Sequence, residues 1–242
     1  MIVLLVPYRN RETDRATLLQ RFRPNVARGE FEIFFVHQRD DRPFNRGAMK
    51  NIGFMAFKER YPDRYHDITF VFHDVDVYPR EGVDIPYDTS HGAVAHYYGF
   101  RFALGGIFAI KGADFERTNG FPSFWGWGLE DNVMQHRCVR SKLTIDRSHF
   151  YPIGDPSIVH TVDGYEREVS RRDANTYFKD KAERNGLTSI RNVRTTFEGD
   201  MIHVDAFETG TGYQPDDFFT KDIRKGNVLR MTRPNRMPMR FL

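Results

Sequence analysis

Continuous apolar runs alternate along residues 1–76 with segments whose apolar residues recur at helix spacing. The run Ile-Val-Leu-Leu-Val at 2–6 predicts a buried strand, which we expect Pro7 to end. Apolar residues at every fourth position predict a helix over 13–26. The same patterns predict a strand over 31–36, a helix over 45–60 and a strand over 68–72. Strands alternating with helices in this way are typical of parallel βαβ units in an α/β protein.

The pattern is less regular after Pro79, where aromatic residues and glycines become frequent. A helix is predicted over 130–140, a strand over 143–145 and a second helix over 170–184. The last twenty residues contain six Lys or Arg and no acid. A charge run of this kind is typical of a solvated extension.

Composition excludes several classes of protein. Of the 242 residues, 40% are apolar, 14% aromatic and 29% charged, which is the profile of a soluble globular protein and not of a disordered chain or a coiled coil. The 36 Lys and Arg residues nearly balance the 33 Asp and Glu residues. We therefore expect no nucleic-acid partner, because such binding depends on many phosphate contacts.

Cysteine content and hydropathy predict the compartment. Cys138 is the only cysteine, which excludes an intrachain disulfide and a cysteine-rich zinc site and indicates a reducing environment. The opening apolar run is far shorter than the ~20 residues of a membrane span. We therefore expect a cytoplasmic protein with no membrane span.

Polar clusters at 7–11 and 73–76 each follow a predicted strand. In parallel sheets, ligands bind beyond the carboxyl ends of the strands, so both clusters should face one crevice. Asp74 and Asp76 there provide the carboxylates that Mg²⁺ or Mn²⁺ binds together with substrate phosphates. The alternative is a turn or a helix cap after the strand.

Arginines lie near the same predicted crevice. Arg9 and Arg11 follow the first strand, and Arg46 begins the second helix, where the helix dipole also favours an anion. Guanidinium groups bind phosphate through paired hydrogen bonds, so the three together suit a diphosphate. Taken singly, each arginine fits a solvated surface charge better than a phosphate contact.

Both tryptophans of the chain lie in the segment 125–131, Trp-Gly-Trp-Gly-Leu-Glu-Asp. Because glycine disfavours a stable core there, we expect a mobile aromatic lid, with Glu130 and Asp131 at the start of the next helix. A carboxylate at that position can serve as a general base. The alternative is a tight turn with the tryptophans packed inward.

Five motifs occur in a characteristic order. They are Val-Pro-Tyr-Arg-Asn-Arg (6–11), Phe-Asn-Arg-Gly (44–47) with Asn-Ile-Gly-Phe (51–54), Phe-His-Asp-Val-Asp (72–76), Leu-Gly-Gly-Ile (104–107) and Asn-Gly-Phe-Pro-Ser-Phe-Trp-Gly-Trp-Gly-Leu-Glu-Asp (119–131). In this order they resemble the β-1,4-galactosyltransferase family, over Ile2 to about Asp205. The resemblance implies a GT-A fold, that is, a Rossmann-like mixed α/β sheet flanked by helices, in a single domain over 1–206. Residues 207–242 would form a basic C-terminal extension.

The resemblance also implies an activity. The donor would be a UDP-sugar, the acceptor a saccharide or glycoconjugate, and the cofactor Mn²⁺, with Mg²⁺ as a substitute. Transfer would invert the anomeric centre and form a β-linkage, most simply β-1,4.

Site residues are carried over by motif. Asp131 resembles the catalytic base, and Asp76 and His160 resemble the metal ligands. Donor contacts are implied for Pro7, Arg9, Arg11, Phe44, Arg46, Asp74, Val75 and Trp127. Contacts to the acceptor or to the donor sugar are implied for Ala103, Gly106, Glu130 and Asn132.

The sequence also departs from the family pattern. Ser157 or Val162 stands where members have a further metal ligand, so water is a candidate third ligand. Asn132 replaces an aspartate that contacts the acceptor. Ala103 replaces a tyrosine of galactose-specific members, which leaves UDP-GalNAc open as the donor. Animal members have a membrane anchor and disulfides, both missing here, so we expect a bacterial, phage or viral enzyme.

Two other functions stay open from the residues alone. Trp-Gly-x-Glu segments also occur in retaining UDP-GalNAc transferases. Leu129, which replaces a glycine of the family pattern, and Asn132 are also compatible with a non-catalytic protein that binds UDP or sugar.

Overall fold

The computed structural model describes residues 1–180 and 184–225. Its principal elements are β1 (Ile2–Tyr8), α1 (Glu12–Ala27), β2 (Glu32–Gln38), α2 (Arg46–Arg60), β3 (Thr69–His73), β4 (Val77–Pro79), β5 (Ala93–Gly99), β6 (Ile107–Lys111), α3 (Gly112–Arg117), α4 (Glu130–Arg140), β7 (Thr144–Asp146), β8 (Tyr151–Pro152), β9 (Ile158–His160), β10 (Glu166–Ser170), α5 (Arg171–Asp180), β11 (Arg191–Glu198), β12 (Met201–Glu208) and β13 (Phe218–Asp222). Short 3₁₀ turns lie at Tyr65–Asp67, Leu187–Ser189 and Pro215–Asp217.

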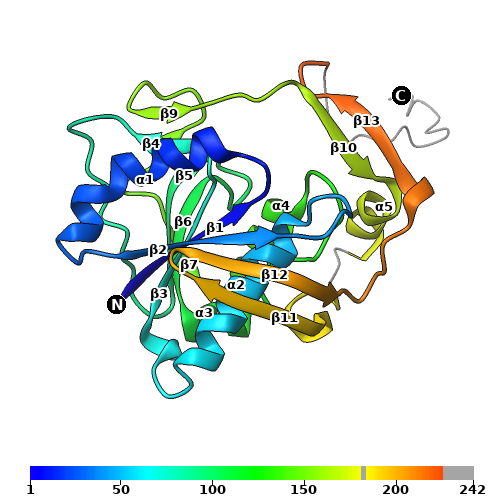
Figure 1. Cartoon of the computed structure of the whole chain (residues 1–242), viewed down its shortest axis with the longest axis horizontal. Coiled ribbons are helices and arrows are strands. Elements are labelled where there is room, and N and C mark those ends of the chain that lie inside the picture. The colour runs from blue at the N-terminus through cyan, green and yellow to red at the C-terminus, as the bar shows by residue number, and fades with distance from the viewer. Residues whose placement is uncertain (181–183, 226–242) are drawn as a thin grey trace, which may run out of the picture.

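A mixed sheet forms the centre of the molecule (Figure 1). Its strand order is β11-β12-β2-β1-β3-β6-β5-β7, and β8 pairs with β5. β1 is parallel to both β2 and β3, which confirms the predicted βαβ units. The strands that continue the sheet past β3 introduce antiparallel pairs, first β3 with β6 and then β6 with β5.

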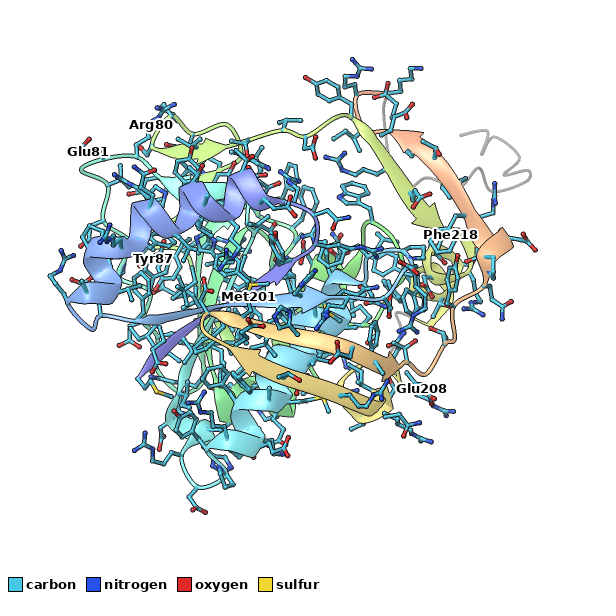
Figure 2. All side chains as sticks on the ribbon, viewed as in Figure 1. Arg80, Glu81, Tyr87, Met201, Glu208 and Phe218 are labelled. Atoms are coloured by element: carbon cyan, nitrogen blue, oxygen red, sulfur yellow. The ribbon has the colours of Figure 1, made fainter. Side chains whose placement is uncertain are left out.

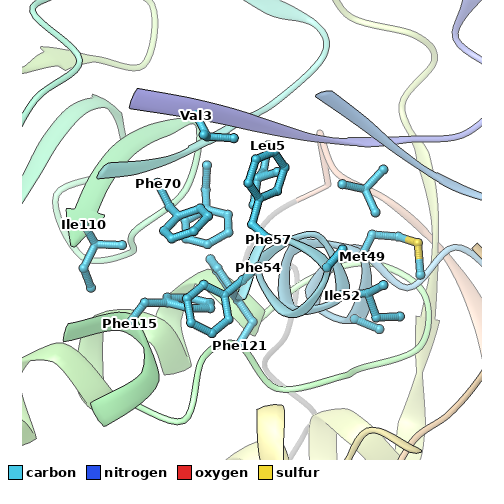
Figure 3. Packing of buried hydrophobic residues seen from close by; sticks show 14 of the residues in the cluster. Val3, Leu5, Met49, Ile52, Phe54, Phe57, Phe70, Ile110, Phe115 and Phe121 are labelled. Atoms are coloured by element: carbon cyan, nitrogen blue, oxygen red, sulfur yellow. The ribbon is translucent and has the colours of Figure 1, made fainter. Parts of the chain in front are cut away.

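Helices α1 and α2 cover opposite faces of the sheet (Figure 1). Alternate residues of β1 point to the two faces, so Leu4 and Val6 pack with the α1 side, and Val3 and Leu5 pack with the α2 side. Figure 3 shows Phe54 and Phe57 of α2 against Phe70 and Leu5. This buried aromatic layer holds α2 in place, and with it the helix start that carries Arg46.

The sequence pattern predicted that Pro7 ends the first strand, and this prediction is wrong. β1 continues to Tyr8, and Pro7 pairs with Val36 of β2. The last pair between β1 and β3 is Leu5 with Phe72, so Pro7 lies where β1 has lost its neighbour on that side. Proline is tolerated at such edge positions because a missing N–H removes no bond of the ladder there.

Three elements of the second half match the prediction, whereas strands β5, β6 and β8–β13 and helix α3 were not predicted. Helix α4 spans the predicted residues, β7 begins one residue after the predicted start, and α5 begins at Arg171. The helix predicted to reach residue 184 is described only as far as Asp180, and residues 181–183 lie outside the described part.

The proposed extension after residue 206 is packed onto the domain where it is described. Phe207 is 3% exposed and belongs to the core on the α2 side. β13 pairs antiparallel with β10, and Figure 2 shows Phe218 at that end of the molecule. Residues 207–222 are therefore attached to the domain, whereas most of the basic run, 226–242, lies outside the described residues.

None of the helices over residues 1–180 and 184–225 combines the length and the hydropathy needed to cross a membrane.

Candidate active site

Four segments meet beyond the carboxyl end of β3. The loop after β3 carries Asp74, whose backbone N–H donates to the carbonyl of Gly106, 2.9 Å away, in the loop before β6. Helix α2 begins beside them, where the buried Asn45 caps the helix by accepting from the N–H of Ala48 at 2.9 Å. Helix α4 is tied to the same loop, because the N–H of Leu104 donates to the carbonyl of Asp131 at 3.0 Å.

Arg46 lies among three carboxylates. Its guanidinium is 3.3 Å from Asp74 Oδ2, 3.4 Å from Glu130 Oε1 and 3.6 Å from Asp131 Oδ2. Glu130 is 3% exposed, so this cation neutralises charge that water does not reach. The predicted diphosphate contact of Arg46 stays a prediction, since in this arrangement the side chain is held by acids.

Asp131 has a second cationic partner, Lys50 of α2. Lys50 Nζ donates to Asp131 Oδ1 at 3.0 Å and lies 3.9 Å from Asp74 Oδ1. A fifth of the Asp131 side chain is exposed, whereas only 1% of the Lys50 side chain is. Asp131 therefore faces the crevice, and Lys50 lies behind it.

The ionisation of these carboxylates differs. Burial raises the pKa of Asp131 to about 6, with a smaller contribution from the neighbouring charge of Glu130, although Lys50 and Arg46 oppose the shift. Burial also acts on Asp74, but there the charges of Arg46 and Lys50 prevail and lower its pKa. Asp131 therefore remains ionised at neutral pH while holding a proton more readily than an ordinary aspartate, as a general base requires.

Asp76 and His160 come together from distant parts of the sequence. β4 and β9 pair antiparallel with Val77 opposite His160, and the N–H of Thr161 donates to the carbonyl of Asp76 at 2.9 Å. This pairing leaves Asp76 Oδ2 and His160 Nε2 4.0 Å apart. Both atoms could bind one ion, because metal–oxygen and metal–nitrogen bonds are about 2.0–2.2 Å long.

Tyr98 of β5 completes this part of the site. Its hydroxyl group lies 3.0 Å from His160 Nδ1. A metal at Nε2 requires the tautomer in which Nδ1–H donates to a neighbouring oxygen, and Tyr98 supplies that oxygen. No group of three or more His, Cys, Asp or Glu side chains suited to a metal ion occurs within residues 1–180 and 184–225. A bound ion would therefore need oxygen atoms from substrate or water as well.

Arg11 lies at the same end of the site. Its guanidinium is 2.6 Å from Asp14, 3.7 Å from Asp76 Oδ2 and 3.8 Å from Asp163. The other predicted residue of that segment, Arg9, donates to the backbone carbonyl of Arg42. The expectation that the clusters 7–11 and 73–76 face one crevice is thus met through Arg11.

Several predicted donor contacts have other neighbours in this structure. Pro7 is buried inside β1, and Val75 is 7% exposed within the core on the α1 side. Phe44 packs against the core on the α2 side, and its carbonyl accepts from the N–H of Gly126 at 3.2 Å. Their contacts to a nucleotide stay predictions.

The two tryptophans have different environments, and the expectation that neither belongs to a stable core is wrong for Trp125. Trp125 is 2% exposed, and the centre of its ring lies 5.6 Å from that of Phe207 in a stacked arrangement. Its Nε1–H donates to the carbonyl of Thr211 at 3.1 Å. Trp127 is half-buried, and its N–H donates to the carbonyl of Glu168 at 2.7 Å. Only Trp127 has the exposure that a lid over the crevice would need.

The predicted sugar contacts lie on the loop before β6 and on α4. Ala103 is 6% exposed, and Asn132 Nδ2 donates to the carbonyl of Phe102 at 3.4 Å. Gly106 contributes its carbonyl to Asp74, as described above. The glycine next to the candidate base is Gly105, which the sequence reasoning did not select.

Three residues of the site were missed, namely Lys50, Tyr98 and Gly105. The sequence signal for Lys50 is that it is a lone cation within the apolar stretch of α2. A lysine on the surface of a helix is instead expected among polar residues. No sequence signal separates Tyr98 from the other tyrosines, because its role depends on the pairing of β4 with β9.

Gly105→Ala is expected to displace Asp131. An added Cβ would lie 2.4 Å from Asp131 Oδ2, which is closer than packed atoms tolerate. Misplacement of a reacting group by about 1 Å can cost up to about 10²-fold in rate. We expect a loss of this size in the sugar transfer that the family resemblance implies, with little change in thermal unfolding. The control is Gly212→Ala, where nothing lies within 4 Å of the new Cβ; equal activity of both variants would contradict the prediction.

Comparisons with known proteins agree with this arrangement. Residues 1–87 match the family described as the N-terminal region of glycosyl transferase group 7, and residues 90–161 match the N-terminal domain of galactosyltransferase. β-1,4-Galactosyltransferase 4 of Cricetulus griseus is 32% identical over 183 residues, which are 70% of this chain and 52% of that protein. β-1,4-Galactosyltransferase 5 of Sus scrofa is 28% identical over 204 residues, 79% of this chain and 50% of that protein. The chain spans about half the length of these relatives.

A solved structure supports the fold. The Drosophila β-1,4-galactosyltransferase 7, crystallised as a mutant with manganese, UDP-Gal and xylobiose, superimposes with a TM-score of 0.58 and 19% sequence identity, covering 84% of this chain and 92% of that one. At this identity the likeness bears on the fold alone. It confirms the GT-A fold predicted for a single domain.

The relatives correct one expectation. They are animal proteins, from hamster, pig, human, mouse and rat. The predicted bacterial, phage or viral origin and cytoplasmic location are therefore wrong. The prediction rested on features missing from these 242 residues, and because the chain spans only half of its relatives, that absence carries no weight.

Proposed function

The chain belongs to the β-1,4-galactosyltransferase family, and from this premise we propose that it transfers galactose from UDP-galactose to a hydroxyl group of a saccharide acceptor. Transfer inverts the anomeric centre, forms a β-linkage and uses Mn²⁺, with Mg²⁺ as a substitute. The observation that carries the proposal is that Asp131 and Asp74 share the cationic neighbours Arg46 and Lys50. Asp74 in turn is two residues from Asp76 in the sequence. The proposed base and the proposed metal-binding segment are therefore close together, which supports the proposal.

The reaction needs a base beside the acceptor. The acceptor hydroxyl gives its proton to the Asp131 carboxylate, and its oxygen forms a bond to the anomeric carbon. The bond from that carbon to the β-phosphate oxygen breaks, and UDP leaves with the electron pair. Asp131 then returns the proton to water. The raised pKa of Asp131, about 6, suits both steps near neutral pH.

The leaving group needs positive charge. Asp76 and His160 would hold the metal ion, which when bound neutralises the diphosphate as a Lewis acid. Arg11 lies 3.7 Å from Asp76 Oδ2 and is available to a phosphate oxygen at the same place. We propose donor contacts for Pro7, Arg9, Phe44, Arg46, Asp74, Val75 and Trp127, and sugar contacts for Ala103, Gly106, Glu130 and Asn132.

The relatives support the choice of substrates. The relatives that match at about 30% identity are β-1,4-galactosyltransferases, which supports a UDP-galactose donor and a β-1,4 linkage. A retaining UDP-GalNAc transferase is therefore not favoured. A non-catalytic protein that only binds sugar is not favoured either, because it needs no crevice-facing carboxylate that is held by a lysine and has a pKa raised to about 6.

A donor screen tests the proposal. With Mn²⁺ and a panel of monosaccharide acceptors, we expect UDP release from UDP-galactose to require an acceptor and to yield a β-linked product, identified by the NMR coupling of its anomeric proton. UDP-GalNAc and UDP-glucose are run beside it, since Ala103 left the N-acetyl sugar open. An α-linked product would establish retention. UDP binding without release from any donor would make the protein a sugar-nucleotide binder.

A further inference from the structure

Lys50 is buried behind the candidate base. It lies in the second turn of α2 with 1% of its side chain exposed, next to the buried Met49 and Ile52. Its ammonium group lies 4.5 Å from the centre of the Phe121 ring and donates to Asp131 Oδ1 at 3.0 Å. Burial of a lysine costs free energy unless the charge is paired. Burial of this ammonium group therefore costs free energy that an apolar residue at position 50 would not cost.

The charges that face Asp131 come from three segments. Lys50 and Arg46 belong to α2, Glu130 precedes Asp131 on α4, and Asp74 follows β3. The cluster therefore contains three carboxylates and only two cations. Loss of either cation would leave three carboxylates with one positive charge. Protonation of one carboxylate would then relieve the repulsion between them.

The two oxygens of Asp131 have different neighbours. Oδ1 is held by Lys50, whereas Oδ2 lies against Gly105 and 3.6 Å from Arg46. Arg46 is the weaker contact of the two, since it is shared with Asp74 and Glu130. The fixed orientation of Asp131 therefore depends chiefly on Lys50.

We propose that Lys50 is a positioning residue of the transfer reaction, which anchors Oδ1 of Asp131 and keeps this carboxylate charged while Oδ2 receives the proton of the acceptor hydroxyl. This inference rests on the proposed function. Lys50 itself does not contact substrate, because it is enclosed by the core. Its ammonium group also balances the charge of Asp74 at 3.9 Å, which couples the base to the segment that carries the metal-binding carboxylate.

The pH dependence of kcat tests this role. In the wild type, kcat should fall below a pH of about 6, where Asp131 becomes protonated. Lys50→Met removes an opposing charge within 4 Å, which should move this acid limb upward by about 1–3 pH units. At pH 7 that shift corresponds to a loss of kcat of about 2- to 90-fold, and kcat should recover as the pH is raised. The KM for the donor should change much less than kcat, because Arg46 still pairs with Asp74, a proposed donor contact.

Two further variants separate charge from packing. Lys50→Gln keeps a hydrogen-bond donor for Oδ1 without the charge, so it should shift the acid limb of the kcat profile as Lys50→Met does. It replaces Lys50→Met in the test if the methionine variant does not fold. The matched control is Lys58→Met on the same helix, which breaks an ion pair with Glu116 away from the site and should leave the profile unchanged. A loss of kcat that is equal at every pH would mean that Lys50 has a structural role only, and would overturn the proposal.

A second readout does not depend on activity. The ¹³C carboxyl signal of Asp131, assigned with Asp131→Asn, is titrated in the wild type and in Lys50→Gln. A higher midpoint in the variant supports the proposal, and equal midpoints overturn it. If the wild type transfers no sugar, the proposed function fails while this titration still decides the role of Lys50.

Discussion

Asp131→Asn should lower the rate of sugar transfer by about 10²–10⁴-fold, the usual cost of losing a general base. The amide cannot take the proton of the acceptor hydroxyl, but it has the shape of the carboxylate. Its oxygen can still accept from Lys50 Nζ, which is 3.0 Å from Oδ1 in the wild type. The fold and the donor site should therefore persist.

Steady-state transfer and UDP titration check this prediction together. UDP affinity in the presence of Mn²⁺ should change little, since Asp131 is placed at the acceptor side of the reaction. Asp63→Asn is the control, because this exposed aspartate follows the opposite end of α2 from Arg46. Transfer by Asp131→Asn within a factor of two or three of the wild-type rate would remove Asp131 as the base.

Asp76→Ala should abolish the Mn²⁺ dependence of UDP binding. The variant removes one of two protein atoms that lie 4.0 Å apart and could share an ion. Without the ion, the charge of the departing UDP is less stabilised, and transfer should fall by about 10²–10³-fold, as for the loss of one charge-stabilising group. His160→Ala should have the same effect, because both residues are assigned to the same ion.

Calorimetric titration of UDP with and without Mn²⁺ measures this effect. The wild type should bind UDP more tightly with the metal, and both variants should bind it equally weakly in either condition. His149→Ala, an exposed histidine, is the control for the loss of an imidazole. Mn²⁺-enhanced binding in Asp76→Ala would refute the assignment and direct attention to Asp74.

Local patterns determined much of the fold. Hydrophobic periodicity depends only on neighbouring residues, so the segments of β1, α2 and α4 were predictable within a few positions. The end of β1 was not, because whether Pro7 can stay in a strand depends on which neighbour it lacks, and that is a property of the sheet. The position of β12 beside β2 likewise had no local signal.

The order of the motifs indicated where the site lies, but only the structure distinguished residues that have similar sequence contexts. Trp125 and Trp127 share the same glycine-rich context, yet one is stacked in the core on Phe207 and the other is half-buried. Which of them packs inward depends on residues 207–213, some eighty positions later along the chain. Residues that the sequence analysis assigned to an extension thus complete the environment of Trp125.

The sequence by itself determined the alternation of strands and helices over residues 1–76, the position of α4, the family, and the acidic and basic residues that follow the strand ends. Only the tertiary structure gave Asp131 its cationic partner, because Lys50 is 81 positions away in the chain, and only the pairing of β4 with β9 brought His160 to Asp76. The physical reason is that ionisation and metal binding depend on burial and on charges a few ångströms away. Those distances are set by packing between segments and not by the neighbouring residues in the sequence.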